Sequence, residues 1–271
     1  MTKSSDIYFP KGEIEKTFIN SIWRLSENDL NERREIILPK GTVEIIFNFS
    51  DTINYFNPSL QVSKSLPTVF INGINFKPFE LTKTGKQDFL GIQLNSIGLQ
   101  LLFNISAKEF NDSVLEGRDV CSQLDNLAYE LFYKQTFTQQ VEILLTWIRK
   151  KISVSNFQFS IRRANKLLSL SNQHNLTVNH ICEQVCLSDR QLRRFSQDWL
   201  GMNTEEFIQY HKYLYSLHLL HRSKQTLTEI GYEAGYYDQS HFIREFKSYT
   251  NLTPKQYRDA NVEYQGHIIV R

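Results

Sequence analysis

The sequence predicts an α+β chain in two parts: a β-rich, sandwich- or barrel-like N-terminal part followed by helices, and an all-α C-terminal part. Apolar and polar residues alternate in short runs over the first ~100 positions, which is typical of half-buried strands. Later, apolar residues recur at three- and four-residue spacing, which is typical of helices. A polar stretch between Lys150 and Phe159 interrupts this pattern, so we predict two domains, over residues 1–155 and 156–271.

The clearest strand pattern lies at residues 42–49, where alternate positions place four apolar side chains on one face: Val43, Ile45, Phe47 and Phe49. A strand at 35–38 leads into it through the turn Pro39-Lys40-Gly41. Shorter strands are predicted at 68–74, 79–84 and 89–94, with turns at Asn72-Gly73 and Thr84-Gly85-Lys86. Two interpretations stay open: Ile45 and Phe47 either line an apolar pocket or fill the interior of the barrel.

Helical spacing of apolar residues predicts helices at 97–103, 119–133 and 139–152. Ser106 and Glu109 have the spacing of a capping box, in which each side chain bonds the backbone N–H of the other residue. The last two helices carry apolar stripes: Leu124, Leu127 and Leu131 on one, and Val141, Leu145, Ile148 and Ile152 on the other. These stripes either pack on their own barrel or form a dimer interface, and the sequence leaves both open.

Two segments of the C-terminal part repeat one plan: a short helix, a tight turn and a second helix that begins with a capping residue. In the first segment, residues 178–185 form the leading helix and Cys186-Leu187 the turn. Ser188 caps the second helix, 189–199, and Gln191 completes a capping box. The outward face of this helix carries Arg190, Arg193, Arg194 and Gln197. A guanidinium donates hydrogen bonds in one plane, which fits guanine edges and phosphates.

In the second segment, residues 227–234 form the leading helix and Gly235-Tyr236-Tyr237 the turn. Asp238 caps the following helix, 239–250, whose buried stripe is Phe242, Phe246 and Tyr249. Its outward face carries Gln239, Ser240, His241, Arg244 and Lys247. Glutamine pairs with adenine, and arginine with guanine, in the major groove. Both segments therefore have the form of a helix-turn-helix unit, which reads DNA with its second helix.

A long helix, about residues 204–223, joins the two units, with Asn203 and Glu206 as its capping box. Twenty residues at ~1.5 Å each span about 30 Å. This is close to the ~34 Å between successive major grooves on one side of DNA, so one chain can place both second helices in consecutive grooves. The aromatic residues of this helix favour a place in the core over a surface that stacks on bases: Phe207, Tyr210, Tyr213 and Tyr215.

Residues 161–261 resemble the AraC/XylS-type DNA-binding domain. The second unit carries the longest match: Ile230, Gly235-Tyr236, Asp238-Gln239-Ser240-His241-Phe242, Arg244, Phe246-Lys247, Thr253-Pro254 and Tyr257-Arg258. The resemblance implies a seven-helix domain that reads asymmetric sites, with these residues toward bases or backbone: Arg190, Arg193, Arg194, Gln239, Ser240, His241 and Arg244. Cys186 departs from the family pattern, which usually has glycine at this turn, so a non-glycine residue needs an uncommon φ there. The run at 38–47 resembles, more diffusely, a domain that precedes such DNA-binding domains.

Composition narrows the remaining classes. The formal net charge is only +2, with a slight basic excess after residue 160. Cys121, Cys182 and Cys186 form no disulfide framework, and a zinc site needs about four ligands. All seven histidines lie after residue 160, which argues against a histidine metal site in the N-terminal domain. With no nucleophile elbow, phosphate loop or HExxH motif, we predict no catalytic residue, metal or cofactor. The sequence has no signal peptide or long apolar run, so we predict a cytoplasmic protein without a membrane partner.

These observations predict a sequence-specific transcription regulator, activator or repressor, and not an enzyme. Its expected partners are double-stranded promoter or operator DNA, a small-molecule effector, RNA polymerase and a second copy of the chain in a homodimer. A second hypothesis is a small-molecule-binding or enzymatic N-terminal domain, with Cys121 as its reactive group and the DNA-binding domain as an accessory. A third, a protein-binding co-regulator without DNA contact, is opposed by the retained arginines.

Overall fold

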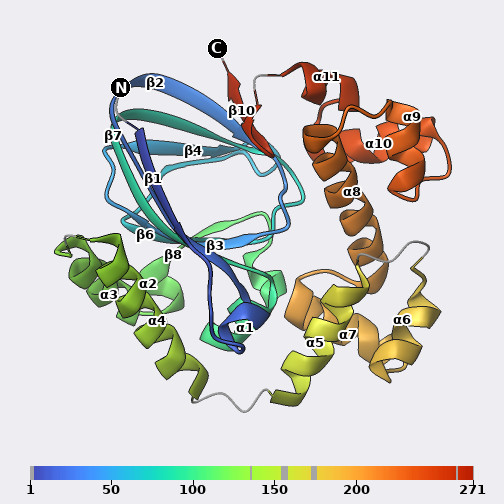
Figure 1. Ribbon diagram of the computed structural model, residues 1–271, viewed down its shortest axis with the longest axis horizontal. Coiled ribbons are helices and arrows are strands. Elements are labelled where there is room, and N and C mark those ends of the chain that lie inside the picture. Colours follow the sequence, from blue (N-terminus) through green and yellow to red (C-terminus); the bar gives the residue numbers. More distant parts are fainter. Residues whose placement is uncertain (1–2, 135, 154–157, 172–175, 261, 271) are drawn as a thin grey trace.

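The computed structural model describes residues 3–134, 136–153, 158–171, 176–260 and 262–270 (Figure 1). A strongly curved antiparallel sheet forms the N-terminal part, with helices against one side of it, and the C-terminal helices are stacked along another side. The strands are β1 (Lys3–Tyr8), β2 (Ile19–Ile37), β3 (Val43–Asn48), β4 (Ile53–Asn57), β5 (Val62–Ser65), β6 (Val69–Asn72), β7 (Phe79–Leu94), β8 (Val114–Glu116), β9 (Val262–Tyr264) and β10 (His267–Val270). The predicted α+β class is confirmed.

The two longest strands, β2 and β7, pair with each other along most of their length and organise the sheet. On the other edge of β7, residues 89–94 pair with β3 and residues 80–83 pair with β4. On the other edge of β2, residues 22–27 pair with β1 and residues 34–37 pair with β10. The strand order β8-β6-β3-β7-β2-β10-β9 has two ends, so the described part of the sheet is barrel-like but not closed.

The turn predicted at Thr84-Gly85-Lys86 is wrong, because these residues lie inside the continuous strand β7. Gly85 has a φ of 70° and faces Leu30 of β2, where the pairing register shifts on both sides. The N–H of Lys86 donates to Asp51 Oδ2 at 2.6 Å. A glycine with positive φ occurs at a β-bulge within a strand as well as in a turn between strands. The presence of glycine therefore did not distinguish a bulge from a turn.

Strand β3 is buried on both of its faces. The predicted face, with Val43, Ile45 and Phe47, packs into a large core shared with the helices. The other face places Ile46 in a second apolar cluster with residues of five other strands: Ile37, Ile53, Tyr55, Phe70, Phe79, Phe89 and Val114. The predicted alternation is therefore correct, and Ile45 and Phe47 fill the interior, as the second of the two interpretations had it.

The helices of the N-terminal part are α1 (Ile97–Phe103), the 3-10 turn η2 (Ala107–Phe110), α2 (Gly117–Val120), α3 (Gln123–Phe132) and α4 (Phe137–Ser153); a further 3-10 turn, η1 (Glu15–Thr17), precedes β2. The apolar stripes of α3 and α4 belong to the large core, so they pack on their own sheet. The capping box predicted at Ser106 is wrong, because this side chain makes no capping bond. Its Oγ instead donates to the carbonyl of Gln197, in the C-terminal part, at 3.4 Å.

The C-terminal helices are α5 (Gln158–Leu170), α6 (Val178–Val185), α7 (Asp189–Leu200), α8 (Thr204–Arg222), α9 (Leu227–Glu233), α10 (Gln239–Thr250) and α11 (Pro254–Asp259). They confirm the predicted helical C-terminal part with its two units. Part of the predicted linker, residues 154–157, lies outside the described residues. No helix in the described ranges is long and apolar enough to cross a membrane.

The segment after α11 turns back to the N-terminal part. It forms the hairpin β9–β10, and β10 pairs with residues 34–37 of β2, so residues 267–270 belong to the N-terminal sheet (Figure 1). Helical periodicity after residue 161 did not predict this return. The division into domains between residues 155 and 156 stays a prediction. It assigns the hairpin β9–β10 to the C-terminal domain, although β10 belongs to the N-terminal sheet.

Candidate functional site

The first helix-turn-helix unit has the local geometry that its sequence predicts. The side chains of Ser188 and Gln191 bond each other's backbone N–H, and this capping box starts α7. Cys186 ends α6 in the left-handed conformation, with φ 54° and ψ 51°. Leu192 and Trp199 are buried beneath α7, whereas Phe195 is only half-buried and Ser196 occupies the fully buried position beside it.

Replacing Cys186 with glycine is expected to stabilise the protein by about 0.5–1 kcal/mol, because the left-handed region costs a residue with a Cβ roughly 1–2 kcal/mol, partly offset by the greater freedom of glycine in the unfolded chain. Urea unfolding of both proteins measures the difference. The matched control is Gly235→Ala in the second unit, where φ is 79°, which is expected to lose stability. If Cys186→Gly instead lost stability, the left-handed conformation of Cys186 would not be a net cost to the free energy of folding.

The second unit is capped at the start of both its helices. Thr226 and Glu229 form a capping box on α9, and Asp238 Oδ1 accepts from the N–H of His241 at the start of α10. Gly235 makes the turn between them with positive φ. Phe242 and Phe246 are fully buried beneath α10. The fixed backbone therefore presents the first two turns of α10 in one orientation.

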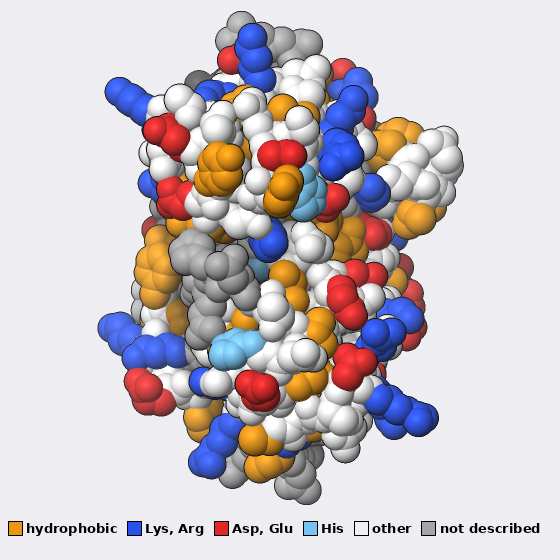
Figure 2. Space-filling view, turned by 90° about the vertical axis from the view of Figure 1, so that its right-hand side faces the viewer, with side chains coloured by type: hydrophobic (Ala, Val, Ile, Leu, Met, Phe, Trp, Pro, Cys, Tyr) orange, Lys and Arg blue, Asp and Glu red, His pale blue; other side chains and the backbone are white. Residues whose placement is uncertain are grey.

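The predicted reading residues lie on the surface of α7 and α10. Seven of the eight are exposed: Arg190, Arg193, Arg194, Gln239, Ser240, Arg244 and Lys247. His241 is half-buried, with its ring edge-on to Tyr236 at a centroid distance of 5.4 Å. The side chain of Arg194 is 89% exposed, and its Nε lies 4.0 Å from Asp198 Oδ2. Figure 2 shows the side on which the C-terminal helices lie, where Lys and Arg groups alternate with Asp and Glu.

Helix α8 connects the two units and lies in the core. Its capping box of Asn203 and Glu206 is present as predicted, and its 19 residues span about 28 Å at ~1.5 Å each. Phe207, Tyr210 and Tyr213 are buried, so three of the four aromatic residues lie in the core as predicted. The Tyr215 hydroxyl, at the surface, donates to Glu233 of α9 at 2.7 Å.

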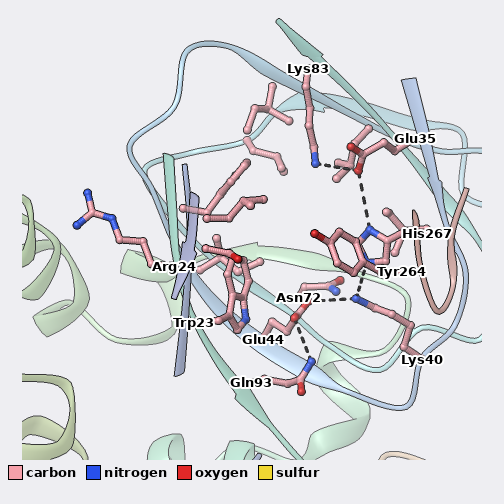
Figure 3. Close-up of a pocket in the computed structure, with 18 of the residues that line it drawn as sticks. Trp23, Arg24, Glu35, Lys40, Glu44, Asn72, Lys83, Gln93, Tyr264 and His267 are labelled. Carbon is pink, nitrogen blue, oxygen red and sulfur yellow. Dashed lines mark hydrogen bonds and ion pairs between the residues drawn. The ribbon is translucent and has the colours of Figure 1, made fainter. Parts of the chain in front are cut away.

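The curved sheet encloses a pocket of about 720 Å³ (Figure 3). Its apolar wall comes from the second cluster and its neighbours, among them Trp23, Ile46, Tyr55, Phe70 and Phe89. Its polar wall, as we name it, comprises Arg33, Glu35, Lys40, Glu44, Lys83 and His267. A cavity with a large apolar wall and a few convergent polar groups is the usual form of a small-molecule site.

The polar wall is a chain of hydrogen bonds and ion pairs that runs along one side of the pocket (Figure 3). Lys83 Nζ lies 2.8 Å from Glu35 Oε2, and the same carboxylate faces His267 Nδ1 at 3.9 Å. The other ring nitrogen of His267, Nε2, lies 2.9 Å from Lys40 Nζ. Because the ammonium can only donate, Nε2 accepts here and the ring proton is on Nδ1.

Burial, and then the charge of Lys40, lowers the pKa of His267 to about 4. Burial opposes ionisation of Glu35, but its contact with the ring N–H of His267 and the charge of Lys83 outweigh this and hold its pKa well below the usual range. Burial lowers the pKa of Lys83, and Glu35 opposes that change. At neutral pH the wall therefore contains a neutral histidine beside an ionised carboxylate.

Folding stability is expected to fall as the pH drops from about 6.5 toward 4. Burial also lowers the pKa of His211 to about 4, so in this window the unfolded chain binds protons at His211 and His267 that the folded chain does not, at a cost of about 2 kcal/mol each. The free energy of unfolding is measured with urea between pH 7.5 and 4.5, a range that lies above the ordinary pKa values of Asp and Glu. His211→Phe and His267→Phe should each flatten this slope, whereas His218→Phe, at an exposed histidine, should not; three equal slopes would contradict the assignment.

Sequence reasoning missed both the face and the histidine of this pocket. The pocket lies on the opposite face of β3 from Ile45 and Phe47, and is lined there by Glu44 and Ile46. The absence of histidine from residues 1–160 did not exclude one from the N-terminal barrel, because His267 enters it from the C-terminal hairpin. Among the described residues, no group of three or more His, Cys, Asp or Glu side chains is placed to hold a metal ion.

Comparison with protein families matches residues 181–260 to the family described as "Helix-turn-helix domain", which is the region of both units. Residues 181–260 form an AraC-type helix-turn-helix domain. Ahead of this AraC-type domain, residues 8–116 match a family described as a domain of unknown function, DUF6597. The two matches together cover the pocket-forming strands β2 to β8 and both helix-turn-helix units.

Curated relatives of the AraC-type domain include the HTH-type transcriptional activator RhaS of Escherichia coli strains SE11 and K12, each 27% identical over 156 residues. That alignment covers 55% of this chain and 56% of RhaS, so the chain spans about half the length of the curated relatives it matches. ToxT from Vibrio cholerae O395 is similar in structure, with a TM-score of 0.47 at 14% identity over 95% of this chain and 97% of ToxT. An AraC-type regulator from Chromobacterium violaceum has a TM-score of 0.35 at 23% identity over 37% of this chain and 92% of its own.

Proposed function

We propose that the chain is a sequence-specific transcription regulator that binds promoter DNA through α7 and α10 and takes a small-molecule effector in the pocket of its N-terminal sheet. The observation that carries the proposal is the pair of capped helix-turn-helix units, joined by one buried helix, with exposed arginine and glutamine on both second helices. The residues in contact with DNA are Arg190, Arg193, Arg194, Gln239, Ser240, His241, Arg244 and Lys247.

The position of these residues along each helix supports DNA contact. Reading helices use their N-terminal residues on base edges. Contacts of α7 with the N-terminal part lie at its other end, where the carbonyls of Gln197 and Gly201 accept from Ser106 and Asn111. The same holds for α10, since Lys77 Nζ donates to the carbonyl of Ser248 near its C-terminus. The first turns of α7 and α10 therefore stay accessible to a duplex.

The pocket supports an effector of mixed character, with an apolar body against the second cluster and a polar group at the polar wall. No observation favours turnover there. Cys121, the reactive group of the enzymatic hypothesis, does not line the pocket, and its Sγ lies 3.3 Å from Lys151 Nζ of α4. A cytoplasmic location, RNA polymerase as partner and a homodimer stay predictions from the sequence.

Selection of genomic fragments by the full chain, followed by gel shift and footprinting, tests the DNA-binding proposal. We expect a protected site whose contacts fall in two consecutive major grooves on one side of the duplex. Affinity for it should decrease linearly with the logarithm of salt concentration, because phosphate contacts release counterions. Failure to select any fragment at low or moderate salt would overturn the proposal.

A further inference from the structure

The turn at residues 38–41, between β2 and β3, is bonded to the C-terminal part at four consecutive residues. The N–H of Leu38 donates to the carbonyl of Gly266 at 2.8 Å, and the carbonyl of Pro39 accepts from the Tyr213 hydroxyl at 2.9 Å. Lys40 Nζ bonds His267 Nε2 at 2.9 Å. The N–H of Gly41 donates to the Tyr210 hydroxyl at 3.0 Å. The partners alternate between the hairpin β9–β10 and helix α8.

One side of this turn belongs to the pocket. Lys40 and Glu44 line it from the N-terminal part, and Tyr264, Gln265 and His267 line it from the hairpin (Figure 3). Lys40 Nζ lies within reach of Glu44, at 3.8 Å, as well as of His267. The bond between Lys40 and His267 therefore joins the two parts of the chain at the wall of the cavity.

The other side of the turn reaches the second helix-turn-helix unit. The N–H of Gly266 donates to the Tyr257 hydroxyl of α11 at 3.3 Å, and the Tyr257 ring packs on Phe246 of α10 with centroids 5.9 Å apart. Through α8, the Tyr213 ring also packs on Phe246, at 5.7 Å. All three aromatic side chains are buried, so a movement of the hairpin or the turn reaches α10 through packed atoms.

We propose that the turn 38–41 and the hairpin β9–β10 form a latch, by which a small molecule in the pocket changes the DNA affinity of the second helix-turn-helix unit. The inference rests on the proposed function and names how the pocket regulates it. An occupant whose acceptor group takes the position of His267 Nε2 at Lys40 Nζ displaces that bond, so it binds better to the chain with the hairpin released. A ligand shifts an equilibrium only through such a difference in affinity.

The latched chain holds its two units by separate bonds to the N-terminal part. Helix α7 is held through Ser106 and Asn111. Helix α10 is held directly through Lys77 and indirectly through α11, which the hairpin bonds at Tyr257. The spacing of the two reading helices is then set by the sheet and not by the duplex. Release of the hairpin removes one of these restraints, so the second unit can adjust to the groove spacing and DNA binding tightens.

The test compares full-length Lys40→Met with Lys11→Met, which removes the same charge from an exposed loop residue. Hydrogen–deuterium exchange is measured in both, and Kd is measured for a fragment that the wild-type chain selects. In Lys40→Met, exchange should rise in residues 262–270 and also in α11 and the second half of α10, with α3 and α4 unchanged. Its Kd should fall at least fivefold relative to Lys11→Met, the lower end of usual allosteric coupling.

A bulky substitution in the cavity, Ile46→Trp, serves as the stand-in for an occupant. It should raise exchange in α11, and this rise should vanish when it is combined with Lys40→Met, because the latch is then already open. Exchange that changes only in residues 38–41 and 262–270, an unchanged or higher Kd in Lys40→Met, or an α11 response that persists in the double variant would each overturn the inference. Absence of DNA binding in every variant, wild type included, would instead overturn the proposed function, and the exchange results would still decide whether the hairpin and α11 are coupled.

Discussion

Replacing Glu35 with glutamine should lower the free energy of unfolding by about 3–5 kcal/mol, the usual cost of removing one member of a buried ion pair. Glu35 is only 4% exposed and receives Lys83 Nζ, Arg33 Nε and the ring of His267 on its two oxygens. Glutamine keeps the shape but not the charge, so it leaves Lys83 buried with only the weaker charge effect of Glu27 in its favour.

The matched control is Glu80→Gln, the same substitution on the neighbouring strand. Glu80 pairs with Arg34, whose side chain is 53% exposed, and solvent-exposed pairs contribute about 0–1 kcal/mol. Urea unfolding at pH 7.5 gives both values on one scale. Equal losses in the two variants would mean that the polar wall of the pocket contributes no more than an ordinary surface pair.

Replacing Arg244 with alanine should weaken binding to the selected fragment by about 1–3 kcal/mol, which is roughly 5- to 150-fold in Kd. Arg244 lies on the exposed face of α10. Phe242 and Phe246, two residues before and after it in sequence, are buried and anchor the helix in the core. If its guanidinium reads a guanine, the loss is confined to sites with that base pair. If it contacts a phosphate, the loss is uniform across sequences and the salt slope decreases by about one.

Arg118→Ala is the control for this measurement, because it also removes an exposed arginine, from α2 in the N-terminal part. Its net charge change is the same, so any general effect of charge on DNA attraction appears in both variants. An equal change of Kd in Arg118→Ala and Arg244→Ala would contradict a direct contact between α10 and the duplex.

Features whose signals are local in sequence were predicted well. The caps at Ser188, Asn203 and Asp238 each depend on residues three positions apart, and α7, α8 and α10 begin where those caps place them. The positive φ of Cys186 was predicted from the resemblance, because the family usually has glycine at this turn. The wrong capping box at Ser106 shows the limit of such signals, since this side chain instead bonds the carbonyl of Gln197, 91 residues away.

Features that depend on pairing between distant strands were not predicted. Strand β1 is almost entirely exposed and polar, so no alternation marked it. Both faces of β3 are buried, and one of them carries polar as well as apolar side chains. Alternation therefore identified one buried face and missed the pocket on the other. The place of His267 follows from the pairing of β10 with β2, which no pattern within residues 262–271 reveals.

The pairing of β10 with β2 also sets an order of events during synthesis. Lys40 and His267 are 227 positions apart, and domains generally fold in sequence as the ribosome releases them, at about 5–20 residues per second. Strand β8 of the N-terminal sheet ends at Glu116, so the sheet can assemble and acquire its apolar cavity roughly 8–30 s before the strand that completes its wall is made. During this interval the nascent sheet has an unpaired edge along residues 34–37, so a molecule that fits the cavity meets it first on the ribosome, with one side still open.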